Sequence, residues 1–275
     1  MAKTIAFINM KGGVGKTTLA VNMAYALAKL HELKVLLIDI DPQMNSTHYC
    51  LSAEAMEALI DEPNRTIYGF LNPKYKAMTT RKNYMPDEPL EDLTMSVEGV
   101  FDIVPSHLKM MEIHIANHPF KLRQYINENF AGKYDVVILD CPPTISNYTK
   151  IGLLAADGYL VPMRADAFSM FGLPMLQEYV QEHIHREFDH KLDFVGVLLN
   201  MVLPNRVIYK KVKERLREHW GDALFTNEIP YREIIVKGLD DSLNKNKFMV
   251  DMAGDKELRE TAARAARELM QRGRL

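Results

Sequence analysis

The sequence is short of cysteines, of long apolar runs and of net charge, and each shortage excludes a class of protein. Its 275 residues include only two cysteines, Cys50 and Cys141, which are too few for a disulfide framework and lie in no spacing typical of a zinc site, so a reduced compartment is expected. No run of about 18 apolar residues is present, so no segment is predicted to span a membrane, and the N-terminus does not resemble a signal peptide. The net charge of -2 and the 47% hydrophobic content exclude a disordered or fibrous chain.

Short apolar runs rich in Ile and Val alternate with helical patterns along the chain. This alternation predicts an α/β fold, a mostly parallel twisted sheet with helices on both faces. Predicted strands cover residues 4–9, 35–39, 101–104, 136–140, 158–162 and 194–200, and predicted helices cover residues 17–30, 107–130, 145–155, 172–187, 206–219 and 256–272. The proline-rich stretch 61–92 is expected to hold a short helix and surface loops. No low-complexity linker divides the chain, so we expect one domain over residues 1–275.

A glycine-rich segment, KGGVGKTT at residues 11–18, lies between the first strand and the first helix. Glycines 12, 13 and 15 let the backbone turn its N–H groups toward a phosphate at the helix N-terminus. In this pattern Lys16 reaches the β- and γ-phosphates and Thr17 places its hydroxyl on Mg²⁺. The alternative is a glycine turn without a ligand. The pattern predicts a P-loop NTPase whose nucleotide contacts are Lys11, Gly12, Gly13, Val14, Gly15, Lys16, Thr17 and Thr18.

The second lysine of this segment, Lys11, resembles the early lysine of the deviant Walker A motif in the ParA/MinD superfamily of ATPases. In that family this lysine reaches across a nucleotide-sandwich dimer to the phosphates of the partner subunit. The resemblance therefore implies an ATP-dependent homodimer with Lys11, like Lys16, in a catalytic role. An extra cation there stabilises charge that builds up on the transferring phosphoryl group. The alternative is that Lys11 is merely solvated beside the loop.

Three aspartates follow predicted strands. The segment Leu36–Asn45 resembles the Asp-x-Asp-Pro-Gln-x-Asn segment of the partition branch of this superfamily, and Val136–Pro143 resembles a Walker B strand. The resemblance implies that Asp41 orients or activates the attacking water and that Asp39 lies close to the magnesium shell. It also implies that Asp140 holds Mg²⁺ through water. An Asp after a strand can otherwise form a turn only.

The resemblance covers most of the chain and implies the nucleotide. Asn200 and Pro230 fall where the family contacts adenine, and no Asn/Thr-Lys-x-Asp guanine motif is present, so ATP is favoured over GTP. The family further implies weak intrinsic hydrolysis of ATP to ADP with Mg²⁺ as cofactor. The nucleotide is expected at the carboxyl ends of the strands, the usual position in an open α/β sheet.

The charge is unevenly distributed. Residues 206–275 hold 16 lysines and arginines against 12 acidic residues, a net charge of +4, and the first 205 residues carry the remaining -6. On the predicted helix 206–219, an apolar face of Ile208, Val212, Leu216 and His219 would leave the basic side chains for solvent or phosphate. ParA-type proteins bind DNA without sequence preference through basic residues of this region. The candidates here are Arg206, Lys210, Lys211, Lys213, Arg217, Arg232, Lys237, Lys245 and Lys247.

The leading hypothesis is a cytoplasmic, nucleoid-associated DNA partition ATPase. It would bind nonspecific DNA as an ATP dimer, and a centromere-binding, ParB-like adaptor would trigger hydrolysis and release. The chain starts at its first strand, so we expect no N-terminal DNA-binding extension. The alternative is a MinD-like membrane-associated positioning ATPase, but the apolar face of the C-terminal helix is mostly alanine, and no stable membrane insertion is expected. An iron–sulfur reductase is excluded because Cys50 and Cys141 do not sit at cluster positions.

Overall fold

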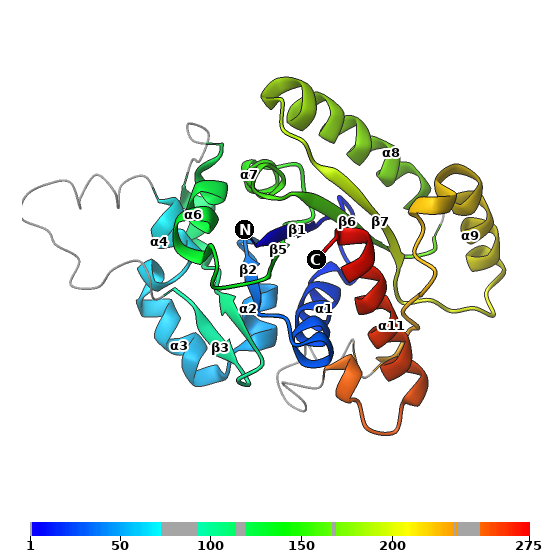
Figure 1. The fold of residues 1–275 in the computed structure, drawn as a ribbon, viewed down its shortest axis with the longest axis horizontal. Helices are drawn as coiled ribbons and strands as arrows, with labels where there is room; N and C mark the ends of the chain where they lie inside the picture. Colours follow the sequence, from blue (N-terminus) through cyan, green and yellow to red (C-terminus); the bar gives the residue numbers. More distant parts are fainter. Residues whose placement is uncertain (1, 73–92, 114–118, 167–168, 234, 236–247) are drawn as a thin grey trace, which may run out of the picture.

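The computed structural model describes residues 2–72, 93–113, 119–166, 169–233, 235 and 248–275. Within these residues, seven strands form one sheet in the order β3-β4-β2-β5-β1-β6-β7 (Figure 1). The strands are β1 (Lys3–Phe7), β2 (Val35–Asp39), β3 (Met95–Val97), β4 (Phe101–Val104), β5 (Val136–Asp140), β6 (Gly158–Met163) and β7 (Asp193–Leu199). All neighbours are parallel except β3, which runs antiparallel to β4 at the edge. The predicted α/β class is therefore confirmed.

The helices lie in two layers, one on each face of the sheet. They are α1 (Lys16–His31), α2 (Asn45–Cys50), α3 (Ala53–Asp61), α4 (Ile67–Leu71), α6 (Lys121–Phe130), α7 (Asn147–Ala155), α8 (Ser169–Val180), α9 (Val207–Trp220) and α11 (Lys256–Gly273). Single 3₁₀ turns at Pro63–Arg65, Leu108–Glu112, Gly221–Ala223 and Met249–Asp251, and a π-helical turn at Gln181–Arg186, complete the described elements. Figure 1 shows α1 and α11 on one side of the sheet and α7 and α8 on the other.

Side-chain alternation along the strands builds the two cores. In β1, Ile5 and Phe7 point into the core under α1 and α11, whereas Ala6 points into the core under α7, α8 and α9. The five residues of β5 are all buried, as a strand covered on both faces requires. The apolar residues of α11 belong to the first core, where Leu258 and Leu269 are fully buried. Among the described residues, no helix has both the length and the apolar character needed to cross a membrane.

Several predicted elements needed correction. The helix predicted over residues 107–130 is a 3₁₀ turn at Leu108–Glu112 followed, after a gap in the described residues, by α6. Pro119 disfavours helical backbone before it, and α6 starts only at Lys121. The helix predicted over residues 172–187 begins earlier, at Ser169, and ends in the π-helical turn. The edge strand β3 and the helices α2 and α3 were not predicted. Of the stretch 61–92, residues 73–92 lie outside the described residues, and α4 is the expected short helix.

Candidate functional site

The glycine loop, residues 11–18, leads from β1 to the first turn of α1. Gly13 and Gly15 have φ values of 72° and 78°, in the left-handed region that favours glycine. Gly15 is the N-cap of α1, and no side chain caps the helix there. The N–H groups of the first turn of this 16-residue helix are therefore available to a ligand, and the helix dipole favours an anionic one.

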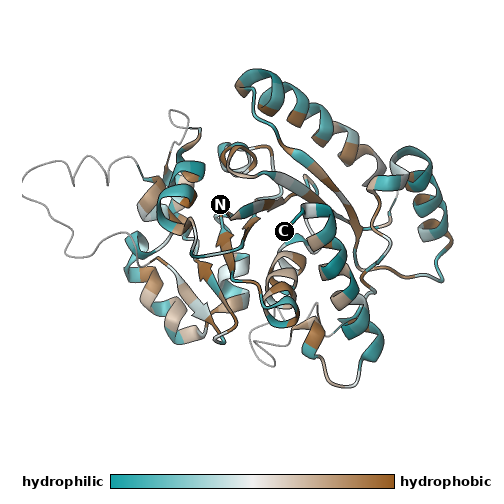
Figure 2. Ribbon diagram, in the orientation of Figure 1, coloured by the Kyte–Doolittle hydropathy of each residue, from teal (hydrophilic) through white to brown (hydrophobic). Residues whose placement is uncertain are grey.

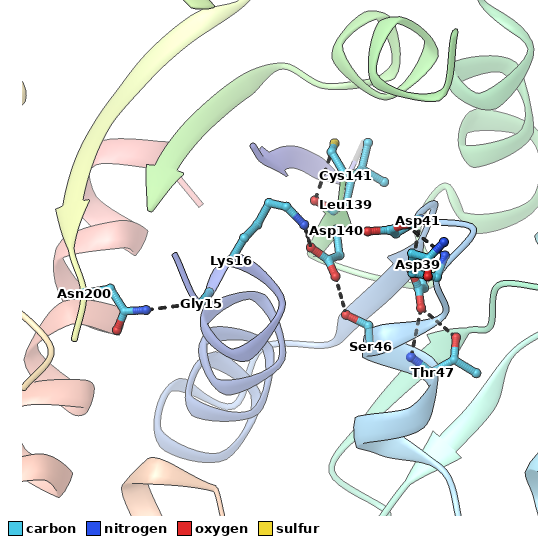
Figure 3. Close-up of polar contacts among 11 residues, drawn as sticks. Gly15, Lys16, Asp39, Asp41, Ser46, Thr47, Leu139, Asp140, Cys141 and Asn200 are labelled. Carbon is cyan, nitrogen blue, oxygen red and sulfur yellow. Dashed lines mark hydrogen bonds and ion pairs between the residues drawn. The ribbon is translucent and has the colours of Figure 1, made fainter. Parts of the chain in front are cut away.

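Lys16 and Asp140 form a buried ion pair at the start of α1 (Figure 3). The Nζ atom of Lys16 lies 2.9 Å from Oδ1 of Asp140, and the two side chains are only 6% and 0% exposed. Burial lowers the pKa of Lys16, but the neighbouring acidic groups, Asp140 foremost and then Asp41, together more than offset that effect, and the net shift is upward. The other carboxylate oxygen, Oδ2, accepts a hydrogen bond of 2.8 Å from the Ser46 hydroxyl. The lysine that the sequence assigns to the phosphates is thus held by the Walker B-like aspartate.

Asp39 is fully buried beside this pair. Its Oδ2 atom accepts hydrogen bonds from the backbone N–H and the hydroxyl of Thr47, at 2.9 and 2.7 Å, and its Oδ1 accepts one from the Asp41 N–H at 3.1 Å. Burial and, after it, the charge of the neighbouring Asp140 carboxylate raise the pKa of Asp39 to about 8, although the hydrogen bonds from Thr47 and Asp41 oppose the rise. These donors hold the Asp39 carboxyl group in place, while its burial beside a second carboxylate favours its protonated form.

Asp41 closes the cluster at the end of β2. Its side chain is 2% exposed, and Oδ1 accepts a hydrogen bond from the Gln43 N–H at 2.9 Å. Burial raises the pKa of Asp41, while the Gln43 N–H and the charge of Lys16 oppose the rise. A carboxylate with a raised pKa accepts a proton more readily, which suits a group facing an attacking water.

Ser46, Thr47 and Ser106 are site residues that the sequence analysis missed. Ser46 and Thr47 open α2, and Ser106 follows β4 at the same edge of the sheet. The Ser106 N–H donates to the Thr47 hydroxyl oxygen at 2.9 Å, and its own hydroxyl donates to the Asp41 carbonyl at 2.8 Å. Ser106 follows the end of β4 closely enough for the sequence to indicate it, because the carboxyl ends of parallel strands meet at one edge. Ser46 and Thr47 lie in α2, well past the end of β2, and no local pattern places them at the site.

Lys11 lies at the mouth of the loop, outside the buried cluster. Its Nζ atom pairs with Oδ2 of Asp166 at 2.5 Å, and the two side chains are 37% and 32% exposed. The Lys11 backbone N–H donates to Asn9 Oδ1 at 2.8 Å, and Asn9 Nδ2 donates to the Pro162 carbonyl at 2.6 Å. Neither Asn9 nor Asp166 was predicted. Together they fix the loop entry against the end of β6.

Asn200 packs directly on the glycine loop. Its Nδ2 atom donates to the Val14 carbonyl at 2.8 Å, and a Cβ added at Gly15 would lie 2.3 Å from that nitrogen. This close approach and the φ of 78° both favour glycine at position 15. An isolated bridge between Val202 and Pro230 brings Pro230 to the segment that follows β7. The two predicted adenine contacts thus come from neighbouring segments at the carboxyl edge of the sheet.

The predicted DNA-binding residues fall into three groups. Arg206, Lys210, Lys211 and Arg217 are exposed on or just before α9. Lys213 and Arg232 carry acidic partners: Lys213 pairs with Glu228 at 2.7 Å, and Arg232 pairs with Asp255 and Glu257. Lys237, Lys245 and Lys247 lie outside the described residues.

The predicted apolar face of α9 was wrong by part of a turn. Ile208 is 43% exposed and His219 is also exposed, while Tyr209 joins Val212 and Leu216 in the core. The Tyr209 hydroxyl donates to Glu228, whose carboxylate also pairs with Lys213. Burying an aromatic ring with a hydroxyl that finds a partner outweighs burying the isoleucine.

The described residues include no group of three or more His, Cys, Asp or Glu side chains arranged to hold a metal ion. The donor set nevertheless fits Mg²⁺ bound together with a nucleotide. Mg²⁺ in such sites takes one or two carboxylates, and substrate phosphates and waters supply the remaining ligands. Asp39 and Asp140 supply carboxylates, and the half-buried Thr17 supplies a hydroxyl at the first turn of α1.

Comparisons with known proteins identify relatives of this chain. The profile of a family described as an AAA domain matches residues 2–194. The chromosome-partitioning ATPase Soj of Thermus thermophilus is 32% identical over 83% of this chain and 81% of its own length. The chromosome partitioning protein ParA of Caulobacter vibrioides is 30% identical over 83% of this chain and 80% of its own length. Among solved structures, a plasmid partition protein of Borrelia burgdorferi bound to AMPPNP superposes with a TM-score of 0.75 at 25% identity, covering 99% of this chain and 98% of that one.

Proposed function

The chain belongs to the ParA/MinD-type family of P-loop ATPases, and on that premise we propose that it is an ATP-dependent DNA partition protein. The names of its relatives, Soj and ParA, support this function. One observation carries the proposal furthest. The glycine loop holds two lysines in different settings, Lys16 buried among carboxylates and Lys11 at the surface of the mouth. The first suits its own nucleotide and the second suits the nucleotide of another chain.

Binding of ATP begins with the glycine loop and the helix behind it. The backbone N–H groups of the first turn of α1 receive the phosphates, and Lys16 leaves Asp140 to pair with them. Thr17, Asp39 and Asp140 would hold Mg²⁺. When bound, the metal neutralises phosphate charge and supplies Lewis-acid stabilisation. We expect Asn200 and Pro230 to contact the adenine.

Hydrolysis then needs a positioned water and a stabilised transition state. We propose that Asp41 orients the water and accepts its proton as the water oxygen attacks the γ-phosphorus, which releases ADP and phosphate. Lys16 remains on the β- and γ-oxygens. Lys11 exchanges Asp166 for the phosphates of the facing subunit in a nucleotide-sandwich homodimer. Without a second chain, the lysine stays paired in its own subunit and turnover is slow.

The proposed DNA binding depends on the exposed basic residues. We expect the exposed Arg206, Lys210, Lys211 and Arg217 to contact DNA phosphates, and a dimer would double that surface. A centromere-binding, ParB-like adaptor would stimulate hydrolysis and so release the protein from DNA, which makes it nucleoid-associated in the ATP state. A MinD-like membrane function gains no support, because the bulky apolar residues of α11 are buried in the core.

The test compares DNA binding by the wild type, Lys11→Ala and the control Lys109→Ala, each with ATP, ADP or no nucleotide. Lys109 is an exposed lysine outside the site. The wild type and the control should bind duplex DNA of arbitrary sequence only with ATP, and more weakly at high salt. Lys11→Ala should bind ATP but lose the ATP-dependent DNA binding. Binding by the variant equal to that of the wild type, or binding that ignores ATP and salt, contradicts the proposal.

A further inference from the structure

The outer face of α11 carries a stripe of long polar side chains. Glu260, Arg264, Arg267 and Gln271 recur at helical spacing, and all four are exposed. Figure 2 shows hydrophilic residues along this side of the helix. None of these residues was singled out by the sequence analysis, which assigned DNA contacts to α9 and the residues after it.

The stripe borders a surface hollow of about 540 Å³, formed between α11 and the segment that follows the 3₁₀ turn at Gly221–Ala223. This volume far exceeds the roughly 30 Å³ that one water molecule occupies in the liquid. Its lining consists of Thr226, Asn227, Arg264, Arg267, Glu268, Gln271 and Arg272. The hollow therefore offers three arginines together with amide and hydroxyl groups and one carboxylate.

The carboxylate of Glu268 does not neutralise the charge of the arginines that face outward. Glu268 is 9% exposed, and its oxygens accept hydrogen bonds from the N–H groups of Thr226 and Asn227 and from the Asn227 side chain, at 2.8 to 3.1 Å. Arg272 pairs with Glu268 at 2.9 Å and donates to the carbonyls of Asp222 and Leu224. Glu268 and Arg272 thus compensate each other and hold the wall of the hollow in place.

Within the described part of the chain, the charges of Arg264 and Arg267 at the opening of the hollow are not compensated by a close ion pair as that of Arg272 is. The Arg264 side chain is 54% exposed; its Nε atom donates to Asn227 Oδ1 at 3.2 Å, and its ion pair with Glu260 is long, at 3.7 Å. Arg267 is exposed on the next turn, near His31 of α1. Burial lowers the pKa of His31 and the charge of Arg267 lowers it further, so the imidazole stays neutral and adds no competing charge.

The composition of this mouth selects its ligand. Arginine, asparagine, glutamine and threonine are the side chains that contact phosphodiester oxygens in nucleic acids. A membrane surface would need bulky apolar residues between the cations, and no large apolar side chain of α11 is exposed. Arg272 also donates to the Asp222 and Leu224 carbonyls, which joins the wall of the hollow to the segment just after the C-terminal end of α9, near the exposed Arg217.

We propose that Arg264 and Arg267, with Gln271 and Asn227, form a site for the phosphate backbone of double-stranded DNA on α11, in addition to the basic surface of α9. This inference rests on the proposed function, because it assigns a second contact surface to the same DNA. The site reads no sequence, since it offers its groups only to phosphates.

The test uses the full chain with ATP and a short duplex of arbitrary sequence, titrated between about 50 and 200 mM salt. The double variant Arg264→Gln/Arg267→Gln keeps good helix formers on α11. Its matched control is Arg65→Gln/Arg186→Gln, two exposed arginines paired with near neighbours on elements next to the opposite core. A second arm measures sedimentation with vesicles containing an anionic phospholipid.

Two lost phosphate contacts should flatten the salt slope of log affinity by about 1.8, at about 0.9 for each contact. Over that salt range the wild type and the control then lose about tenfold more affinity than the α11 variant. ATPase activity without DNA should be unchanged in both variants.

Equal affinity and slope in the α11 variant and the wild type overturn the α11 site alone. Failure of the wild type to bind DNA with ATP overturns the proposed function itself. Loss of vesicle binding instead of DNA binding overturns the assignment to nucleic acid.

Discussion

Two regions of this molecule hold ion pairs in opposite surroundings. At the carboxyl edge of the sheet, Lys16 and Asp140 are 6% and 0% exposed and meet at 2.9 Å. On α11, Glu260 and Arg264 are 50% and 54% exposed and lie 3.7 Å apart. The buried pair interacts in a medium that screens little, whereas water and salt screen the exposed pair. Removing one partner therefore has very different consequences in the two places.

The difference matches what each region is proposed to do. A site that receives phosphates gains from a lysine and carboxylates already held in position, because little reorganisation is then needed during the reaction. A surface that must bind DNA and let it go gains from charges that salt can compete with. The following four experiments test this contrast, from the largest expected effect to the smallest.

The largest effect is expected from Asp140→Ala. The change leaves Lys16 charged, buried and without its carboxylate, so the nucleotide-free protein should lose about 3 to 5 kcal/mol of unfolding free energy. Urea unfolding measures the loss, with Asp61→Ala, at an exposed position, as the control. The double variant Lys16→Met/Asp140→Ala should recover most of the loss because no unpaired charge remains. If the unfolding free energy of Asp140→Ala stayed within about 0.5 kcal/mol of that of the wild type, the ion pair would not contribute as a buried pair does.

The next effect, ranked by its size per pH unit, concerns Asp39. The pKa of this carboxyl group in the folded chain, about 8, is above its ordinary value, so folding favours the protonated form. The contribution is complete below the ordinary pKa and is lost as pH rises through the folded pKa. From about pH 4 to pH 8, unfolding free energy should therefore fall by up to about 1.4 kcal/mol per pH unit from this group.

Asp39→Asn isolates the contribution of that group, because the amide stays neutral at every pH. The variant should show a shallower decline than the wild type in urea unfolding series at several pH values, while Asp61→Asn should follow the wild type. A decline as steep in Asp39→Asn as in the wild type would mean that Asp39 titrates normally in the folded protein.

An intermediate case is Lys213, whose side chain is 22% exposed and pairs with a Glu228 that is 13% exposed. Lys213→Met should cost about 1 to 2 kcal/mol in unfolding free energy and leave DNA affinity nearly unchanged, because the charge is already compensated. Lys210→Met, at an exposed neighbour, should do the reverse. If both lysines affect stability and DNA binding alike, exposure does not separate structural from binding charges on α9.

The smallest effect is expected from Lys256→Gln at the start of α11. Lys256 is 81% exposed and lies 3.6 Å from Glu260. Exposed pairs of this kind contribute less than about 0.5 kcal/mol, so the midpoint of urea unfolding should hardly move and should be insensitive to added salt. A loss above about 1 kcal/mol would place this pair with the buried one and weaken the contrast.

The sequence predicted the buried region better than the exposed one. Six of the seven strands and the glycine loop have local signatures, since apolar runs and glycine spacing are read directly along the chain. The grouping of Lys16, Asp39, Asp41 and Asp140 at one edge follows from parallel strands alone, and the structure shows it. Their roles in catalysis and in binding Mg²⁺ stay predictions, as does the single domain.

The remaining features depend on contacts between distant segments. Asp166 reaches Lys11 across 155 positions, and no spacing rule connects them. Helix α2 starts after Met44, which has a φ of 58° although it is not a glycine, so the turn left no trace in the sequence. On α9, the register of the buried face was set by Glu228, which lies outside the helix and meets the Tyr209 hydroxyl. A sequence pattern within one helix or strand cannot predict contacts with such distant residues.

The strand order also says something about how the chain must assemble. β1 and β2 are consecutive in sequence but do not pair with each other, because β5 lies between them and bonds to both. During synthesis the first two strands therefore cannot complete their pairing until residues 136–140, which form the strand between them, have left the ribosome. Such delayed closure makes folding slow and leaves apolar strand edges exposed. A chain truncated before β5 is therefore expected to aggregate or to need chaperones, and it should express poorly as an isolated fragment.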